Sequence, residues 1–218
     1  MLADLISWAP ELFEGLRLTV GMTFGGMAIA LVLGLLLALG RISPSAWLRA
    51  PVVVFVELIR GSPLLLQLFY LYYVLPAFGL KLTPIEAGLL GLGINYGAYL
   101  SEVFRAGIAA VSPGQREAAE SLGMSGGQTM RFIILPQAWR IVIPPTGNYF
   151  VSLFKDTALV STISIAELMF QGQLIASDTF RYMRIYSIIF VIYVVISIPA
   201  SMGVRWLERH FNRSAAAR

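Results

Sequence analysis

The segment Ser112–Pro136 reads SPGQREAAESLGMSGGQTMRFIILP and is the one long polar stretch in an otherwise apolar chain. It contains two helix starts in succession. The run Ser112-Pro113-Gly114-Gln115 has the pattern of a capping box with proline at the first helical position, and residues 125–128 repeat the start signal. Gly123 predicts the end of the first helix, because glycine tolerates the left-handed conformation in which helices often end. The sequence therefore predicts a short capped helix in a loop, to which another protein could bind.

The composition places the rest of the chain in a lipid bilayer. Of its 218 residues, 57% are hydrophobic and 13% are charged, whereas soluble domains carry about a quarter charged residues. The net charge of +4 comes from arginines spread among apolar segments, which favours a membrane topology signal over nucleic-acid binding. Cysteine is absent and His210 is the single histidine, so we assign no residue to catalysis or to a metal site.

The fold class that we expect is an all-α polytopic membrane protein with a single domain over residues 1–218. A span needs roughly 20 apolar residues, and five segments qualify. They are residues 16–40, 52–76, 85–111, 137–154 and 186–206, with the polar loop 112–136 between spans three and four. The second span should kink at Gly61-Ser62-Pro63, and Pro144-Pro145 should break the fourth.

Two further segments are predicted to be short helices that do not span. Residues 1–13 have mixed polarity and suggest either an interfacial helix with Trp8 at headgroup level or a frayed terminus. The N-terminus does not look like a signal peptide, since it carries acidic residues and no early lysine or arginine. Residues 157–182 alternate apolar and polar residues, and we expect a short helix around Ile165–Gly172.

The distribution of basic residues predicts the orientation. With the N-terminus outside and the C-terminus in the cytoplasm, most arginines of the loops face the cytoplasm, as the positive-inside rule requires. These arginines are Arg41, Arg49, Arg116, Arg131, Arg205, Arg209, Arg213 and Arg218, whereas Lys81, Lys155, Arg181 and Arg184 fall outside. The loop at 112–136 is then cytoplasmic.

Polar residues recur at helical spacing on two of the spans. Span three carries Asn95, Tyr99, Glu102 and Arg105, and span four carries Asn148, Ser152 and Lys155. An ionisable residue within a span normally faces the bundle interior or a water-filled cavity. We therefore take these seven residues as candidates for a substrate path. The other interpretation is that Glu102–Arg105 and Glu57–Arg60 are internal ion pairs, which we favour for both pairs.

From periodicity alone, the loop helix could serve equally well as a contact for a partner or as an ordinary helix packed on its own membrane domain. The pattern Glu117-Ala118-Ala119, Gly123, Ile133-x-Leu135-Pro136 resembles the EAA motif, EAA-x3-G-x9-I-x-LP, of permease subunits of ABC importers. The runs 60–67, 97–105 and 144–157 are similar to the branch that imports polar amino acids such as histidine, glutamine, glutamate, arginine and opines. One departure is Tyr149, where many members of the branch carry an acid.

The resemblance implies a role for each part of the chain. The EAA helix is the coupling helix, seated in a groove of a cytoplasmic ATPase subunit, and its contact and stop residues would be Glu117, Ala118, Ala119, Leu122, Gly123 and Met124. The partners implied are two ATP-binding cassette subunits, a second permease subunit of the same or a homologous kind, and an extracellular or periplasmic binding protein that delivers the amino acid. The location implied is the bacterial plasma (inner) membrane.

The lysines support one of these implications independently. A P-loop needs Gly-Lys-Ser/Thr, but the chain's two lysines, Lys81 and Lys155, follow Leu80 and Phe154. ATP and magnesium would therefore bind the partner ATPase, and this chain would be a transport subunit without an ATPase site or cofactor of its own. The alternative is a secondary transporter or channel driven by an ion gradient, which broken helices and charges within spans also fit.

Overall fold

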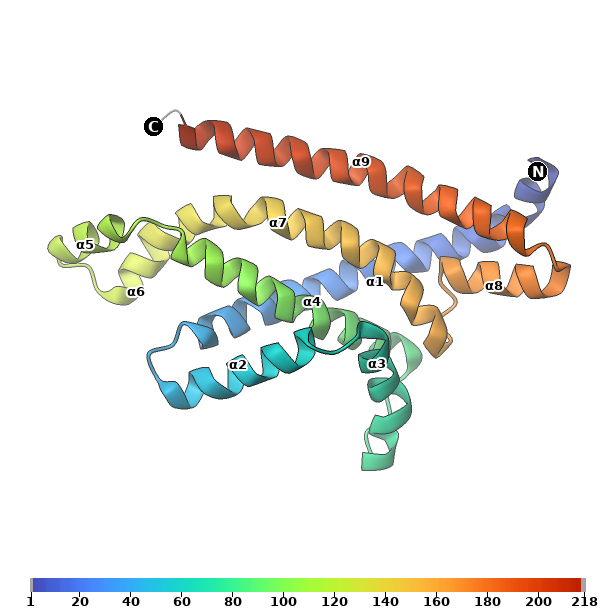
Figure 1. Ribbon diagram of the computed structural model, residues 1–218, viewed down its shortest axis with the longest axis horizontal. Helices are drawn as coiled ribbons and strands as arrows, with labels where there is room; N and C mark the ends of the chain where they lie inside the picture. Colours follow the sequence, from blue (N-terminus) through green and yellow to red (C-terminus); the bar gives the residue numbers. More distant parts are fainter. Residues whose placement is uncertain (1, 217–218) are drawn as a thin grey trace.

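The computed structural model describes the backbone of residues 2–216 and the side chains of residues 6–210, and this described part is helical with connecting turns. Its longest helices, α1 (Leu2–Arg41), α4 (Pro84–Ala109), α7 (Leu135–Asp156) and α9 (Tyr182–Ala216), run along the long axis of the molecule (Figure 1). The beginning of α1 lies at one end of that axis, and the last turns of α9 lie towards the other, where α5 (Pro113–Ser121) and α6 (Gly126–Gln128) also lie.

Helix α1 corrects the prediction of a separate helix over residues 1–13. One continuous helix runs from Leu2 to Arg41, with Pro10 inside it. Gly15, which lies between the two predicted segments, does not form a turn, because it is helical and packs closely on the backbone of Leu168. The side chain of Trp8 is half-buried and packs on the cluster that joins α1, α8 (Leu168–Thr179) and α9, so the start of α1 belongs to the bundle.

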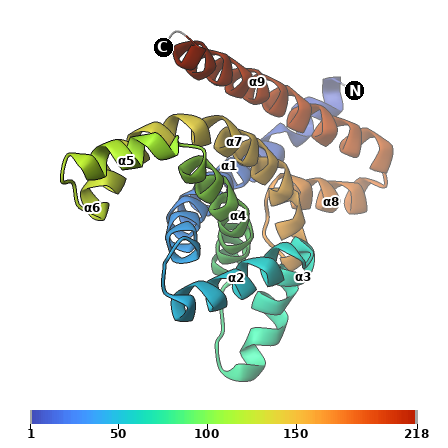
Figure 2. The same cartoon turned by 60° about the vertical axis from the view of Figure 1, so that its left-hand side comes forward.

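The predicted break at Gly61-Ser62-Pro63 is confirmed, and the bend is sharp. Helix α2 (Ala46–Arg60) and the helical segment that begins with α3 (Leu64–Phe69) meet at 106° (Figure 2). Pro63 has no backbone N–H and is extended. The hydroxyl of Ser62 donates to the carbonyl of Leu58, and the Gln67 amide donates to the carbonyl of Ile59 at 2.7 Å. These side chains satisfy the end of α2, and the chain continues through a π-helical turn, η1 (Tyr70–Val74), and a 3-10 turn, η2 (Leu75–Phe78).

Helix α4 is the centre of the bundle. It begins with a capping box in which Thr83 accepts from the backbone N–H of Glu86 while the Glu86 carboxylate accepts from that of Thr83. It packs along α1 through small residues, so closely that a Cβ at Gly93 would lie 2.4 Å from Ile29 Cγ2. Most of its length is buried, which explains how α4 can carry several polar residues.

Helix α7 contradicts the predicted break at Pro144-Pro145. The helix continues through both prolines, and Pro144 is buried. The fixed φ of proline is compatible with helical geometry, and its cost is the loss of the backbone hydrogen bonds that the missing N–H groups would make. The chain before α7 is a π-helix, η3 (Thr129–Ile134), so the irregularity lies before the helix and not within it.

The region after α7 contains two short helices where one was predicted. A 3-10 helix, η4 (Thr157–Ile163), ends at Ser164 with a positive φ of 65°, and α8 follows. The predicted helix at 165–172 thus begins three residues later and extends to Thr179. Helix α9 then packs on α7 and α8 at the edge of the bundle (Figure 2). Of its described large apolar side chains, only Ile185, Ile189 and Val204 are buried.

Length and composition pick out two helices of the described part as able to cross a membrane, over Ile6–Arg41 and Tyr182–His210, or up to four spans if each bent pair counts as one. The bent pairs are α2 with the segment after it, and the helices between Gly126 and Thr179. Helix α4 is not among them, because its polar residues lower its hydropathy. The count of five spans remains a prediction.

Candidate functional site

The loop Ser112–Pro136, which we call the EAA loop, is built around α5. Figure 1 shows α5 and α6 at one end of the molecule, beyond the end of α4. The end of α5 is a Schellman motif, in which the N–H of Gly123 donates to the carbonyl of Glu120 and the N–H of Met124 donates to that of Ala119. Gly123 has a φ of +76°. The prediction that Gly123 ends the helix is confirmed.

The two predicted caps of the EAA loop have different outcomes. At the second, Ser125 accepts from the backbone N–H of Gln128, and the Gln128 side chain accepts from the backbone N–H of Ser125 at 2.9 Å, so the capping box is confirmed. The first is wrong, since the Ser112 side chain makes no cap hydrogen bond and Gln115 donates its N–H to the carbonyl of Ser112 instead. The backbone carbonyl of Ser112, and not its hydroxyl, accepts the hydrogen bond from the first turn of α5. The Ser112 residue also lines a neighbouring cavity.

The predicted contact residues of the loop divide by exposure. Glu117, Ala118 and Gly123 are exposed, and Leu122 is 82% exposed, although it is an apolar side chain. Ala119 is buried where α5 packs on η3, and Met124 is half-buried. Leu122 is therefore accessible to a partner at the tip of the loop. Ala119, in contrast, holds the helix to its own chain.

The second half of the EAA motif anchors the loop to the membrane helices. Ile134 is buried together with Ile108 of α4 and Ala138 of α7, and Leu135 packs against the same cluster. The π-helix η3 leads directly into this cluster. Movement of α5 would therefore be passed to α4 and α7 through packed side chains.

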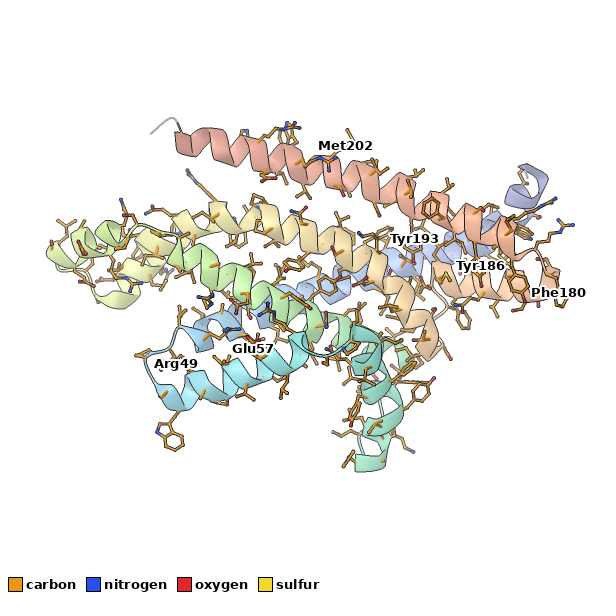
Figure 3. The ribbon with its side chains drawn as sticks, in the orientation of Figure 1. Arg49, Glu57, Phe180, Tyr186, Tyr193 and Met202 are labelled. Atoms are coloured by element: carbon orange, nitrogen blue, oxygen red, sulfur yellow. The ribbon has the colours of Figure 1, made fainter. Side chains whose placement is uncertain are left out.

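A cluster of five charged side chains joins α1, α2 and α4. Glu102 is its centre, because it pairs with Arg41, with Arg105 at 2.9 Å and with Arg60 at 3.6 Å. Glu57, which is labelled in Figure 3 on the side of α2 towards α4, pairs with Arg41 and Arg60, both at 3.6 Å. The predicted ion pairs Glu57–Arg60 and Glu102–Arg105 are both confirmed. Three arginines and two glutamates leave one net positive charge.

Sequence reasoning missed Arg41 as a member of this cluster. We placed it at the cytoplasmic end of the first span, where an arginine is expected on topological grounds alone. Its side chain is only 10% exposed and bridges Glu57 and Glu102. The sequence did show more arginines than glutamates at the ends of the spans. The partner of each arginine, however, depends on how the helices pack, and the spacing of residues along one helix does not determine that packing.

The other polar residues of α4 face α3 and α7. Asn95 is buried and donates to Gln67 Oε1 at 3.1 Å. The ring of Tyr99 lies 5.7 Å from that of Tyr149, and the Arg60 guanidinium lies 5.5 Å from the centre of the Tyr99 ring, a cation–π contact. Tyr149 thus places an aromatic ring against α4.

The polar residues of α7 do not join those of α4 within this chain. Asn148 and Lys155 are exposed and Ser152 is half-buried, and no hydrogen bond or ion pair of the described residues links them to the α4 set. The neighbouring Asp156 faces α4 instead, where it accepts from the Tyr96 hydroxyl at 2.7 Å. The polar residues of α7 therefore lie on the surface of this chain, where a neighbouring subunit could contact them.

A buried carboxylate at the start of α8 was not predicted. Glu167 is fully buried and accepts from the hydroxyls of Thr19 on α1, at 3.1 Å, and Tyr193 on α9, at 3.2 Å. Its other oxygen accepts from the N–H of Phe170. Figure 3 shows Tyr193 on α9 over the crossing of α1 and α7. These donors come from α1, α8 and α9, so Glu167 joins three helices through hydrogen bonds. The signal in the sequence was Glu167 itself, an acidic residue that caps a helix within an apolar run.

The comparisons with known proteins decide the family. The family described as the inner membrane component of binding-protein-dependent transport systems matches residues 10–216. The chain belongs to this family. A probable amino-acid ABC transporter permease of Sinorhizobium fredii is 44% identical over 95% of this chain and 90% of its own length. The glutamine transport permease GlnP of Escherichia coli is 39% identical over 93% and 94%, and the L-cystine permease TcyB of Bacillus subtilis is 39% identical over 98% and 92%.

Solved structures agree with this membership. The crystal structure of an amino acid ABC transporter with histidines contains a chain that is 38% identical, with a TM-score of 0.90 over 96% of this chain and 98% of that one. The methionine transporter MetNI, at 18% identity and a TM-score of 0.73, shares the fold. The resemblance to ABC-importer permeases is thereby confirmed for the chain as a whole.

Proposed function

We propose that this chain is the membrane-spanning permease subunit of an ATP-driven importer that translocates a polar amino acid, and that α5 couples it to a separate ATPase. The observation that carries the proposal is the EAA loop itself. Its helix ends rigidly at Gly123, presents Leu122 to solvent, and is packed through Ile134 onto α4 and α7. A partner that moves α5 would thus move two of the central helices.

The arrangement of the ends supports the proposed orientation. The start of α1 and the last turns of α9 lie towards opposite ends of the long axis (Figure 1), as five spans with an outside N-terminus and a cytoplasmic C-terminus require. The EAA loop and Arg41 lie at the same end as the last turns of α9. This is the end that the positive-inside rule assigns to the cytoplasm of a bacterial plasma membrane.

The substrate class rests on the relatives and on the polar side chains of α4 and α7. Relatives named for amino acids, glutamine and L-cystine are 39% to 44% identical. An amino-acid zwitterion needs an anionic partner for its ammonium group and donors for its carboxylate. Tyr99 and the Glu102 cluster supply both kinds of group from α4, and Asn148, Ser152 and Lys155 would supply donors where a second permease subunit meets this one.

The proposal also names the remaining partners. Two ATP-binding cassette subunits would bind ATP and magnesium, since this chain has no P-loop lysine. A second permease subunit would complete the path, and an extracellular or periplasmic binding protein would deliver the amino acid. The chain itself would bind no cofactor.

The test is reconstitution of the complex that co-purifies with the tagged chain. Mass identification should find an ATP-binding cassette subunit, and uptake of a radiolabelled amino acid into proteoliposomes should require ATP on the side of the EAA loop together with the binding protein. Uptake that follows a proton or sodium gradient without ATP would refute the proposal and favour a secondary transporter.

A further inference from the structure

A cavity of about 860 Å³ lies between the EAA loop and the ends of α1 and α4, and we call it the cationic cavity. Three arginines from three elements line it: Arg41 of α1, Arg105 of α4 and Arg116 of α5. Glu117 and Glu120 also line it, but both are exposed on the side of the loop, whereas Arg41 and Arg105 come from the membrane helices. Arg41 and Arg105 belong to the Glu102 cluster, which carries one net positive charge, so the wall formed by the membrane helices is positive, whereas Arg116, Glu117 and Glu120 leave the loop side with one net negative charge.

Buried polar atoms in the walls of the cationic cavity lack partners. Among the described residues, Nη1 of Arg41 and the hydroxyl of Thr129 are buried without a hydrogen-bond partner. Thr129 is only 2% exposed and the Arg41 side chain only 10%. Buried polar groups are normally satisfied, and leaving one unpaired costs free energy. One nitrogen of an arginine that is otherwise ion-paired and one hydroxyl lack partners beside the same cavity, which points to a ligand with anionic oxygens.

An apolar cavity of about 360 Å³ adjoins the cationic one, and Ile108 lines both. Its walls are formed by side chains of α1, α4 and α7, which include Leu31, Leu35, Phe104, Leu135, Trp139 and Val142. On α1, Leu31 and Leu35 share a helical face with Ile42 of the cationic cavity, at spacings of eleven and seven residues. The two cavities therefore lie end to end along this side of the bundle, with Ile108 between them, and we call them together the groove.

The groove has the dimensions of half a bilayer. Leu31 and Arg41 are ten residues apart on α1 and therefore lie about 15 Å apart along it at 1.5 Å per residue, which is half of the roughly 30 Å hydrocarbon core. Its positive end lies at the EAA loop, and its apolar end lies further along α1 on the outside of the bundle, where Val32 is 64% exposed. Positive charge at the membrane surface followed by an apolar channel matches one amphipathic ligand.

We propose that this groove binds an acidic phospholipid of the leaflet next to the EAA loop, with the phosphate in the cationic cavity and an acyl chain in the apolar one. Juxtamembrane arginines attract acidic lipid headgroups. A headgroup held there contacts α1, α4 and α5 together, so the lipid would brace the EAA loop against the two membrane helices through which its motion passes. The site requires the loop to lie at a membrane surface, but it does not require an ATPase.

Trp139, which lines the apolar cavity and is 61% exposed, provides a local probe. The full chain, with Trp8, Trp47 and Trp206 replaced by phenylalanine, is reconstituted in phosphatidylcholine vesicles that contain a minor share of brominated phosphatidylglycerol or of brominated phosphatidylcholine. We expect the acidic brominated lipid to quench Trp139 fluorescence more strongly at equal mole fraction. Equal quenching by both lipids, or by neither, would overturn the proposal.

Two substitutions test the two ends of the groove separately. R116Q removes an exposed charge for which the described part of the chain shows no ion pair, and it should lower the preference for phosphatidylglycerol about fivefold, the equivalent of ~1 kcal/mol per arginine at a membrane surface. V32F should abolish the preference by filling the apolar end. The matched controls R140Q and L36F change exposed residues of the same kind that do not line the groove, and they should leave the preference unchanged.

Each variant has an outcome that would contradict the proposal. A preference that survives V32F would show that only a free headgroup binds, and one that falls equally in R140Q would show general attraction to a basic surface. These measurements need no transport, so failure of the lipid site is distinguishable from failure of the proposed transport function.

Discussion

Replacement of Gly123 by valine should uncouple ATP hydrolysis from uptake, and the backbone geometry of Gly123 allows the size of this effect to be estimated. Gly123 has a φ of +76°, and a Cβ placed there would meet no atom within 4 Å. The cost is therefore backbone strain alone, roughly 1–2 kcal/mol for an L-residue in the left-handed region, and a β-branched residue lies at the upper end. The native end of α5 would become about 5- to 30-fold less favoured relative to other conformations.

The assay is amino-acid uptake per ATP hydrolysed in proteoliposomes that contain the whole transport complex. We expect Gly123→Val to lower this ratio by about the same 5- to 30-fold, while the amount of folded complex stays unchanged, because the loop end is exposed and contributes little to the core. Gly123→Asn is the matched control, since asparagine tolerates the left-handed conformation better than other residues, and it should retain most of the coupling.

Two results would refute this reasoning. If valine supports wild-type uptake per ATP, the left-handed end of α5 does not matter for coupling. If asparagine fails as completely as valine, the requirement is for an absent side chain, as at a tight contact with the ATPase, and the strain argument is wrong.

Three further predictions concern stability, each measured as the midpoint of thermal unfolding of the purified chain in one detergent. Glu102→Gln should destabilise the folded chain by about 2–4 kcal/mol, because it leaves three arginines around a neutral group. Glu57→Gln should cost less than ~1 kcal/mol, because Glu57 is 58% exposed and its ion-pair distances are 3.6 Å. Equal effects of the two substitutions would show that Glu102 is not the centre of the cluster. Gly93→Val should cost about 1–3 kcal/mol by overpacking against α1, and the same change at Gly21, which has open space around it, should cost clearly less. Ser125→Ala should cost about 1 kcal/mol for the lost cap, and an unchanged midpoint would show that the second capping box is not needed.

The sequence predicted the parts of the fold that depend on local chemistry. The end of α5 at Gly123, the cap at Ser125 and the bend at Gly61-Ser62-Pro63 each follow from the backbone freedom or the hydrogen-bonding groups of a few neighbouring residues. The ion pair Glu102–Arg105 also follows, because its members lie on adjacent turns of one helix. The same logic failed at Ser112, where a backbone carbonyl replaced the hydroxyl as the acceptor.

Features that depend on packing between helices could not be predicted in this way. The sequence gives no reason to join Arg41 to Glu102, or Thr19 and Tyr193 to Glu167, because each contact spans helices whose relative rotation is fixed only in the bundle. Pro144-Pro145 illustrates the reverse error, in which a strong local signal for a break is overridden by the burial of the helix on which it lies.

The central position of Glu102 links the two candidate sites. One of its partners, Arg60, lies over the ring of Tyr99 in the proposed substrate path, and two others, Arg41 and Arg105, line the cationic cavity behind the EAA loop. A shift of α4 that loosens one of these pairs therefore alters the charge presented to both places at once. Because Ile108, six residues beyond Glu102 on α4, contacts the same cluster as Ile134 of the EAA loop, a displacement of the loop would reach Glu102 through a single helix. The charged cluster is thus placed where a movement of α5 would change the electrostatic potential at both places.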